Sequence, residues 1–183
     1  SIPGRNYLED GEAIIDDFSD GYGLYDAVWF VSNGELDKIT SLTVIGKFTE
    51  NDWFEAKSLS NCGIIDLSRT TGLTYVPSML FREAQSLNSI ILPASIRGIG
   101  YGAFSGCDSL TNLTLLSTVP PQVESGTFAG SNSDNFVVYV PAASVSLYKA
   151  TDVWKDLDIR PLKSQVKSLQ VTIDKKIDIK IYK

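Results

Sequence analysis

The chain has 183 residues, of which 43% are apolar and 21% charged, a composition typical of one globular body that excludes collagen, disorder and a disulfide scaffold. Its formal net charge of −6 argues against nucleic acid as the main partner, because phosphate neutralisation needs a basic field. The sequence contains no His, the commonest general base and metal ligand, so we expect no cofactor, no metal and no catalytic site.

Residues 1–19 are acidic and weakly patterned. Residues 1–36 carry eight acidic side chains against a single Arg, and we expect residues 1–19 to be an extended lead-in or a linker. The first 20 residues lack the basic stretch and apolar core of an export signal, and no run approaches 18 consecutive apolar residues. We therefore expect no transmembrane segment.

A short helix is predicted next, with Asp20 placed to cap it. Its apolar stripe comprises Leu24, Ala27, Val28 and Val31. Tyr25 and Trp29 are four residues apart and lie beside this stripe, so they form an aromatic ledge on the helix surface. A ledge of this kind can stack against sugars.

Short apolar strand phrases follow at a regular spacing. Their first residues are 23, 25, 23 and 25 positions apart: Ile39, Cys62, Leu87, Leu110 and Asn135. Between the first two phrases, Thr49 with Asp52 three residues later forms a variant of the capping box. This pair predicts a helix over residues 53–59.

The repeat is clearest in the middle of the chain. Residues 76–92 and 99–115 share five apolar positions at a constant offset of 23, and residues 123–140 repeat part of the pattern. Burial of five such side chains contributes roughly 10 kcal/mol, less than the conformational entropy lost when about 23 residues become ordered. One copy therefore cannot fold alone, and the array should unfold as a unit.

One of the shared positions is aromatic in all three copies, as Phe81, Phe104 and Phe128. Because equivalent side chains of stacked copies meet one another, we expect these rings to form one continuous stack.

Alternate side chains of the strands should point outward and form two columns on one sheet face. The first column is Ser41, Ile64, Ser89, Asn112 and Val137, and the second is Thr43, Asp66, Ile91, Thr114 and Tyr139. Repeat proteins commonly bind along such a face. The candidate binding residues for a protein or peptide are Ile64, Asp66, Arg69, Ser89, Ile91, Asn112, Thr114 and Tyr139. The alternative is a soluble sheet surface without a partner.

The C-terminal part is predicted to close the array. Pro141 leads into a short helix over Val145, Leu147 and Tyr148, and this helix should cover the last strand together with Trp154. Residues 163–183 carry six Lys against two Asp, and their apolar residues are spaced by twos around a central turn. This spacing predicts a strand hairpin packed at the end of a repeat domain over residues 20–162.

Two segments carry a family resemblance. Residues 92–100 (LPASIRGIG) and 103–115 (AFSGCDSLTNLTL) resemble the BspA-type leucine-rich repeat of bacterial cell-surface proteins. Residues 39–67 are similar to the first repeats of that family. The pattern departs at residues 82–84, where a Gly-Cys pair would be usual, and at Asn135, where an apolar residue would open the strand.

The resemblance implies an α/β repeat solenoid, a right-handed coil with strands on one face and helical caps at both ends. It also implies a non-catalytic bacterial module that is secreted or held at the cell surface, for example by a lipid anchor, and that binds an extracellular protein or peptide in adhesion. We expect a monomer. A carbohydrate-binding accessory protein is the alternative, favoured if Tyr25 and Trp29 are exposed.

A glycine-rich segment offers a competing interpretation. Gly98, Gly100 and Gly102 match the letters of a dinucleotide-binding turn. The equivalent segment of the previous copy has Pro77 and no Gly, so we assign these glycines to a turn between strands.

The remaining reactive side chains give weak signals. Cys62 and Cys107 occupy core positions of different kinds in the repeat, so we expect buried free thiols. Two groups of carboxylates lie in polar stretches: Asp16, Asp17 and Asp20, and Asp152, Asp156 and Asp158. Without burial neither group gains the raised pKa of an acid catalyst, and we expect solvated charge.

Overall fold

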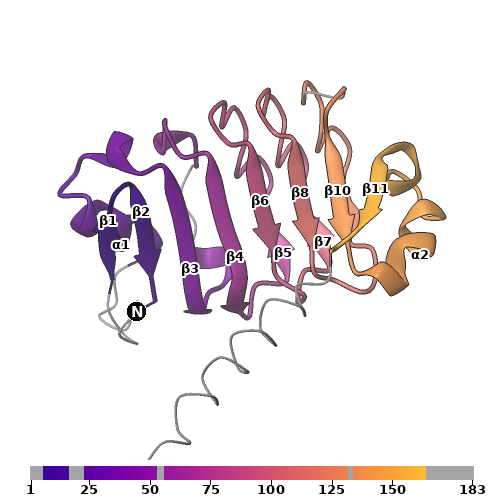
Figure 1. The fold of residues 1–183 in the computed structure, drawn as a ribbon, viewed down its shortest axis with the longest axis horizontal. Helices are drawn as coiled ribbons and strands as arrows, with labels where there is room; N and C mark the ends of the chain where they lie inside the picture. Colours follow the sequence, from indigo (N-terminus) through magenta and orange to yellow (C-terminus); the bar gives the residue numbers. More distant parts are fainter. Residues whose placement is uncertain (1–5, 17–22, 53–55, 132–133, 164–183) are drawn as a thin grey trace, which may run out of the picture.

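The computed structural model describes residues 6–16, 23–52, 56–131 and 134–163. Their strands form an eight-stranded sheet in the order β1-β2-β3-β4-β6-β8-β10-β11 and a three-stranded sheet in the order β5-β7-β9. Figure 1 shows the large sheet as a single row of strands, with α1 at one end and α2 at the other. None of the helices in the described residues is both long enough and apolar enough to cross a membrane.

The strands are short, as the phrases predict. The large sheet comprises β1 (Tyr7–Glu9), β2 (Glu12–Ile15), β3 (Ser41–Lys47), β4 (Ile64–Thr71), β6 (Ser89–Leu92), β8 (Asn112–Leu115), β10 (Val137–Val140) and β11 (Asp158–Pro161). The small sheet comprises β5 (Tyr75–Val76), β7 (Gly98–Ile99) and β9 (Gln122–Val123). Each middle repeat therefore contributes one strand to each sheet.

The helices are few. The α-helices are α1 (Leu24–Val31) and α2 (Val145–Lys149), and the 3-10 turns are η1 (Leu36–Lys38), η2 (Glu50–Asp52), η3 (Ala56–Ser58), η4 (Ala142–Ser144) and η5 (Trp154–Asp156).

Strand register places equivalent residues of the repeats side by side. All neighbours in the large sheet are parallel except β1, which is antiparallel to β2. One inward row consists of Leu42, Ile65, Ile90, Leu113 and Val138, each at most 2% exposed. A slip of one residue would turn this row toward solvent, so burial of the row fixes the register.

The predicted phenylalanine stack is confirmed. The ring centroids of Phe81 and Phe104 lie 5.1 Å apart with an interplanar angle of 7°, and those of Phe104 and Phe128 lie 5.9 Å apart at 10°. Phe81 and Phe104 are fully buried. Rings of adjacent repeats thus bury one another. A single repeat on its own lacks this burial.

Two aromatic residues end the stack. Trp154 packs edge-on against Phe128, with ring centroids 5.9 Å apart, and Tyr148 packs edge-on against Trp154 at 5.5 Å. Both residues are fully buried, yet the Trp154 indole N–H donates to the carbonyl of Pro121 and the Tyr148 hydroxyl donates to the carbonyl of Ser117. These contacts confirm the expectation that Trp154 covers the end of the array.

The departure at residues 82–84 keeps the repeat conformation. Glu83 has a φ of 58°, while Gly106, one copy later, has a φ of 70°. Ala84 is buried in the place that Cys107 takes in the next copy. The packing of neighbouring copies therefore holds a glutamate in a left-handed conformation that favours glycine.

The prediction for residues 1–19 is wrong where the structure describes them. Residues 7–15 form the β1–β2 hairpin, and β2 pairs with β3 in parallel. Ala13 and Ile15 are buried in the core. Asp10 and Gly11 have positive φ angles of 48° and 83°, as in the tightest hairpin turns. These two residues form the turn, while Glu9 and Glu12 end and begin the strands that extend the sheet.

Three local expectations need correction. The helix over residues 53–59 is replaced, in the described part, by η2 and η3, although the Thr49 N–H does donate to the Asp52 carboxylate over 2.7 Å. Leu147 is 48% exposed, because the short α2 turns its neighbour Tyr148 inward. Asn135 is exposed, and Phe136, 5% exposed, takes the buried position ahead of β10.

The first helix follows its predicted stripe. Leu24, Ala27 and Val28 are buried, whereas Val31 is only partly buried. Gly23 stands at the start of α1 without a side-chain cap, and Asp20 lies outside the described residues. The hairpin predicted within residues 163–183 also lies outside them, apart from Lys163.

Substitution of Phe104 with Ala should lower the free energy of unfolding by about 3–5 kcal/mol. The reason is that Phe104 is the one ring stacked on both sides by Phe81 and Phe128. Urea denaturation monitored by circular dichroism measures the change, and Phe104→Leu, which preserves most of the buried volume, should cost clearly less. A loss below about 1 kcal/mol for Phe104→Ala would show that the stack contributes little.

Candidate functional site

The two predicted columns align as the spacing predicts, but Thr43 is buried, at 9% exposure, and does not belong to the exposed face. The pairing partners across the sheet are Ser41, Ile64, Ser89, Asn112 and Val137 in one column, and Thr43, Asp66, Ile91, Thr114 and Tyr139 in the other. Ile64 is 47% exposed, an unusual exposure for a large aliphatic side chain in a strand. The alignment of the columns is confirmed, whereas their use in binding remains a proposal.

The structure lengthens both columns at the β11 end. Asp158 pairs with Val137, and Arg160 pairs with Tyr139. The Arg160 guanidinium donates two hydrogen bonds to the Asp158 carboxylate, at 2.6 Å from Nη2 and 3.1 Å from Nε. Hydrogen bonding to Arg160 lowers the pKa of Asp158, and the same contact raises the pKa of Arg160.

Two candidate residues on β4 have different surroundings. Asp66 accepts a hydrogen bond from the backbone N–H of Ser68 at 2.8 Å, so its carboxylate helps to shape its own strand. Arg69 is exposed and pairs with Ile45, just after an irregularity in the β3–β4 register. The structure therefore places Arg69 beside the columns and not within them.

The aromatic ledge on α1 is exposed in part. Tyr25 is 42% and Trp29 43% exposed. Trp29 lies flat against Gly34, where a Cβ would be 3.2 Å from the indole ring. Phe30 was not predicted as part of this ledge, yet it is 61% exposed and packs edge-on against Trp29 with ring centroids 5.7 Å apart. The ledge lies at the β1 end of the large sheet (Figure 1).

The glycine turn is filled by the protein itself. A Cβ on Gly100 would lie 2.6 Å from the Ser78 backbone nitrogen, and one on Gly98 would lie 2.9 Å from the Tyr75 ring. The Gly100 N–H donates to the carbonyl of Val76. These glycines allow adjacent repeats to approach closely. No space remains for a dinucleotide at this turn, so the structure does not support that interpretation.

Both cysteines are free and buried, as expected. Burial raises the pKa of each thiol from the ordinary value of 9.0 to about 11. The Cys107 thiol also donates to the carbonyl of Phe81 at 2.9 Å, which ties two repeats together. At neutral pH both sulfurs are thiols and therefore poor nucleophiles.

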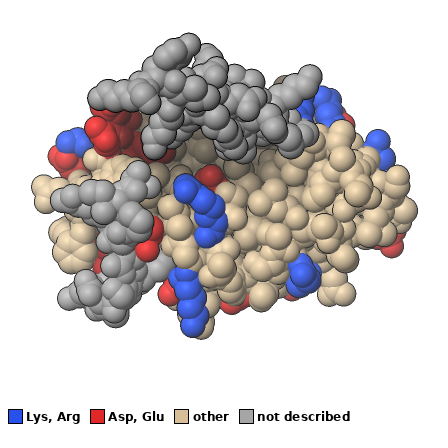
Figure 2. Space-filling model, turned by 60° about the horizontal axis from the view of Figure 1, so that its bottom comes forward, with Lys and Arg blue, Asp and Glu red and all other residues tan. Residues whose placement is uncertain are grey.

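Asp152, Asp156 and Asp158 are exposed, whereas Asp16 is partly buried. Asp152 pairs with Lys155 at 2.7 Å, and this hydrogen bond lowers the pKa of Asp152. Asp17 and Asp20 lie outside the described residues. Within the described residues no group of three or more His, Cys, Asp or Glu could hold a metal ion. On the face shown in Figure 2, Lys and Arg side chains lie apart on mostly uncharged surface.

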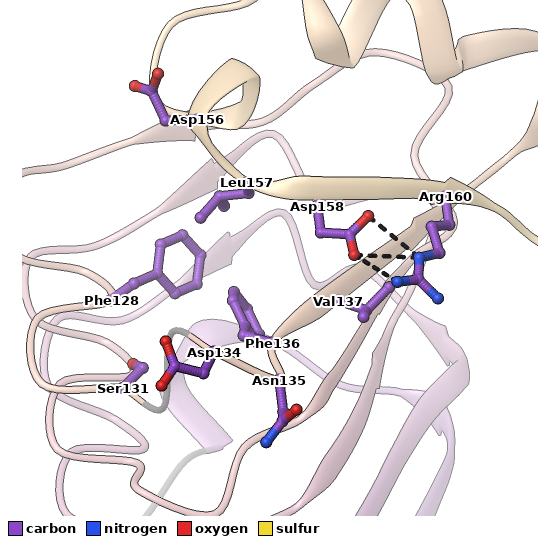
Figure 3. Close-up of a pocket in the computed structure, with 10 residues that line it drawn as sticks. All are labelled: Phe128, Ser131, Asp134, Asn135, Phe136, Val137, Asp156, Leu157, Asp158 and Arg160. Atoms are coloured by element: carbon purple, nitrogen blue, oxygen red, sulfur yellow. Dashed lines mark hydrogen bonds and ion pairs between the residues drawn. The ribbon is translucent and has the colours of Figure 1, made fainter.

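A cavity of about 590 Å³ lies between the starts of β10 and β11. Its lining residues are Phe128, Ser131, Asp134, Asn135, Phe136, Val137, Asp156, Leu157, Asp158 and Arg160. Figure 3 shows the Phe128 and Phe136 rings with Leu157 on one side and the Asp158–Arg160 ion pair on the other. The sequence analysis did not predict this cavity. One sequence signal could have indicated it: the polar Asn135 stands where the other strand phrases begin with an apolar residue.

A comparison with models of protein families matched more than half of the chain. A model of the BspA type leucine-rich repeat region matches residues 37–146 in six copies. No curated protein matches the chain. The matched residues include β3, β4, β6, β8 and β10 together with the whole small sheet.

Substitution of Gly100 with Ser should lower the free energy of unfolding by about 1–3 kcal/mol, because the new side chain meets the Ser78 backbone. Gly23→Ser is the matched control, since a Cβ on Gly23 has nothing within 4 Å, and its effect should stay within about 0.5 kcal/mol. Thermal and urea unfolding measure both variants. Equal effects at the two positions would contradict the close approach.

The buried thiols should make stability fall as the pH rises. Between pH 9 and 11 the unfolded chain loses thiol protons that the folded chain keeps, so the folded state binds more protons and the free energy of unfolding decreases. From pH 8 to pH 10 the fall from this cause should be about 1.3 kcal/mol for each thiol. Urea unfolding at both pH values measures it, and Cys62→Ala/Cys107→Ala should lack it. An identical pH dependence in this double variant would contradict the prediction.

Proposed function

The chain belongs to the BspA-type leucine-rich repeat family, and from that premise we propose that it is a non-catalytic bacterial binding module that acts in protein–protein interaction. We further propose that it works at the cell surface or in secreted form, as a monomer, and takes part in adhesion. In this proposal the repeats form a right-handed coil over residues 20–162, which α1 and α2 close. Members of this family are typically surface or secreted proteins, which supports the proposed location.

The observation that carries the proposal is the unbroken register of the outward columns. Six strands, from β3 to β11, place equivalent side chains next to one another. At about 4.8 Å between strands, the columns extend over roughly 24 Å. A surface of this length can offer many weak contacts to one partner without any buried reactive group.

The composition of the columns suits a protein partner. Ile64, Ile91 and Tyr139 provide apolar and aromatic contacts, while Asn112 and Thr114 provide donors and acceptors between them. Interfaces are rich in Tyr, and their binding energy concentrates in a few apolar or aromatic anchors. We propose Ile91 and Tyr139 as such anchors, because they are outward neighbours of Thr114 in a single column.

A carbohydrate-binding role is the second candidate. The observation in its favour is the 43% exposure of Trp29 at one end of the molecule. An exposed indole face can pack against a sugar ring. The ledge lies outside the columns, so the two candidate functions depend on different residues.

The double variant Ile91→Ala/Tyr139→Ala should bind at least 10-fold more weakly than the natural chain to the protein that binds best in a panel of immobilised matrix proteins. A 10-fold change equals 1.4 kcal/mol, which the loss of a single anchor exceeds. The matched control is Val119→Ala/Tyr101→Ala, which removes two exposed side chains of similar size away from the columns. This control should keep affinity within about threefold.

Equal losses in the two double variants, or no matrix protein bound by the natural chain, would contradict the proposal. Binding to an immobilised glycan that is lost in Trp29→Ala, with no effect of the column variant, would favour the second candidate.

A further inference from the structure

The cavity between β10 and β11 exists because the repeats end there. In the middle of the array, Phe104 is covered on both sides by its equivalents Phe81 and Phe128. Phe128 instead meets Trp154 edge-on, and it remains partly exposed at the cavity. The closing segment thus covers Phe128 only in part and leaves an open volume of about 590 Å³.

One side of this cavity is apolar. Phe136 packs against Phe128 with ring centroids 5.4 Å apart and an interplanar angle of 45°, and Leu157 lies beside them (Figure 3). Phe128 and Leu157 are partly exposed at the cavity, whereas Phe136 is 5% exposed and supports Phe128 from the core. Such a surface favours the flat C–H face of a ring and cannot satisfy a polar group.

The rest of the lining carries hydrogen-bonding groups of both kinds, with Asp134 near Phe128 and Arg160 on the opposite side of the two rings (Figure 3). Asp134 provides acceptors, Asn135 provides an acceptor and two N–H donors, and the Arg160 guanidinium provides donors. Arg160 also neutralises Asp158 through their ion pair. Asp156 points away from the two rings in Figure 3, so among the described residues of the lining Asp134 contributes the uncompensated charge that faces this space.

This lining restricts the chemistry of a ligand. A phosphate would face the Asp134 carboxylate, and an ammonium group would leave the Asn135 and Arg160 donors without acceptors. A neutral molecule with several hydroxyl groups and an apolar ring face satisfies both sides, because each hydroxyl donates and accepts. The volume falls within the range of roughly 300–1,000 Å³ that is common for small-ligand sites, and it is larger than one sugar ring requires.

We propose that this cavity binds a neutral oligosaccharide, with one sugar ring against Phe128 and Leu157 and its hydroxyl groups bonded to Asp134, Asn135 and Arg160. The site differs from the aromatic ledge on α1, which lies at the opposite end of the large sheet (Figure 1). The cavity shares Val137, Asp158 and Arg160 with the β11 end of the columns. Its lining does not include Ile91 or Tyr139, so variants of those two residues distinguish protein binding by the columns from glycan binding in the cavity.

The test uses the whole chain on an array of neutral glucose-, galactose- and N-acetylglucosamine-containing oligosaccharides, followed by calorimetry with the best binder. Asp134→Asn/Asn135→Ala should lose at least 10-fold in affinity, and Arg160→Gln should lose affinity as well. The control Asp108→Asn/Asn51→Ala makes the same two changes at exposed positions outside both the cavity and the columns and should bind like the natural chain. Circular dichroism checks that each variant keeps its fold, which is expected because all five side chains are exposed.

Three results would overturn the proposal. The first is an array on which no oligosaccharide binds the natural chain. The second is equal weakening in the cavity variant and in the control. The third is binding that is insensitive to the cavity variants but lost in Trp29→Ala, which would assign the glycan to the ledge.

Discussion

This structure depends on one constraint: each repeat must bury its apolar side chains against the neighbouring repeats. No repeat of about 23 residues buries enough apolar surface to offset its own ordering. The missing burial comes from the parallel stack of Phe81, Phe104 and Phe128 and from the buried row across the large sheet. Each repeat therefore depends on the next. The close backbone approach at Gly100 and the Cys107 contact with the previous repeat follow from the same need.

An array of this kind must end somewhere, and the two ends are closed differently. At the β1 end, a hairpin continues the sheet and adds Ala13 and Ile15 to the core. At the β11 end, Trp154 and Tyr148 turn edge-on and place their polar atoms on backbone carbonyls. Because the inward side chains carry the stability, the outward columns are available for recognition. The imperfect fit at the last repeat leaves a cavity that a regular repeat would fill.

The parts that sequence predicts well are those repeated in several copies. Recurrence of Phe104 and of the strand phrases is sufficient to place the stack and both columns, because five equivalent positions average out local irregularity. Features that occur only once in the chain were harder to predict from the sequence. The Asp10–Gly11 turn, the strand β11 and the replacement of Asn135 by Phe136 in the core each rest on a short local pattern. The cavity was not predictable because it arises from what Trp154 leaves uncovered, which depends on ring orientation and not on spacing.

Native-state hydrogen exchange at increasing urea concentration tests the central claim most directly. The observable is the free energy of opening for amides in β4, β6, β8 and β10. If the repeats shelter one another, these free energies converge on a single value before global unfolding, because no strand opens while its neighbours remain folded. Separate values that persist for β4 and β10 would show that the two halves fold independently, and that result would contradict the account.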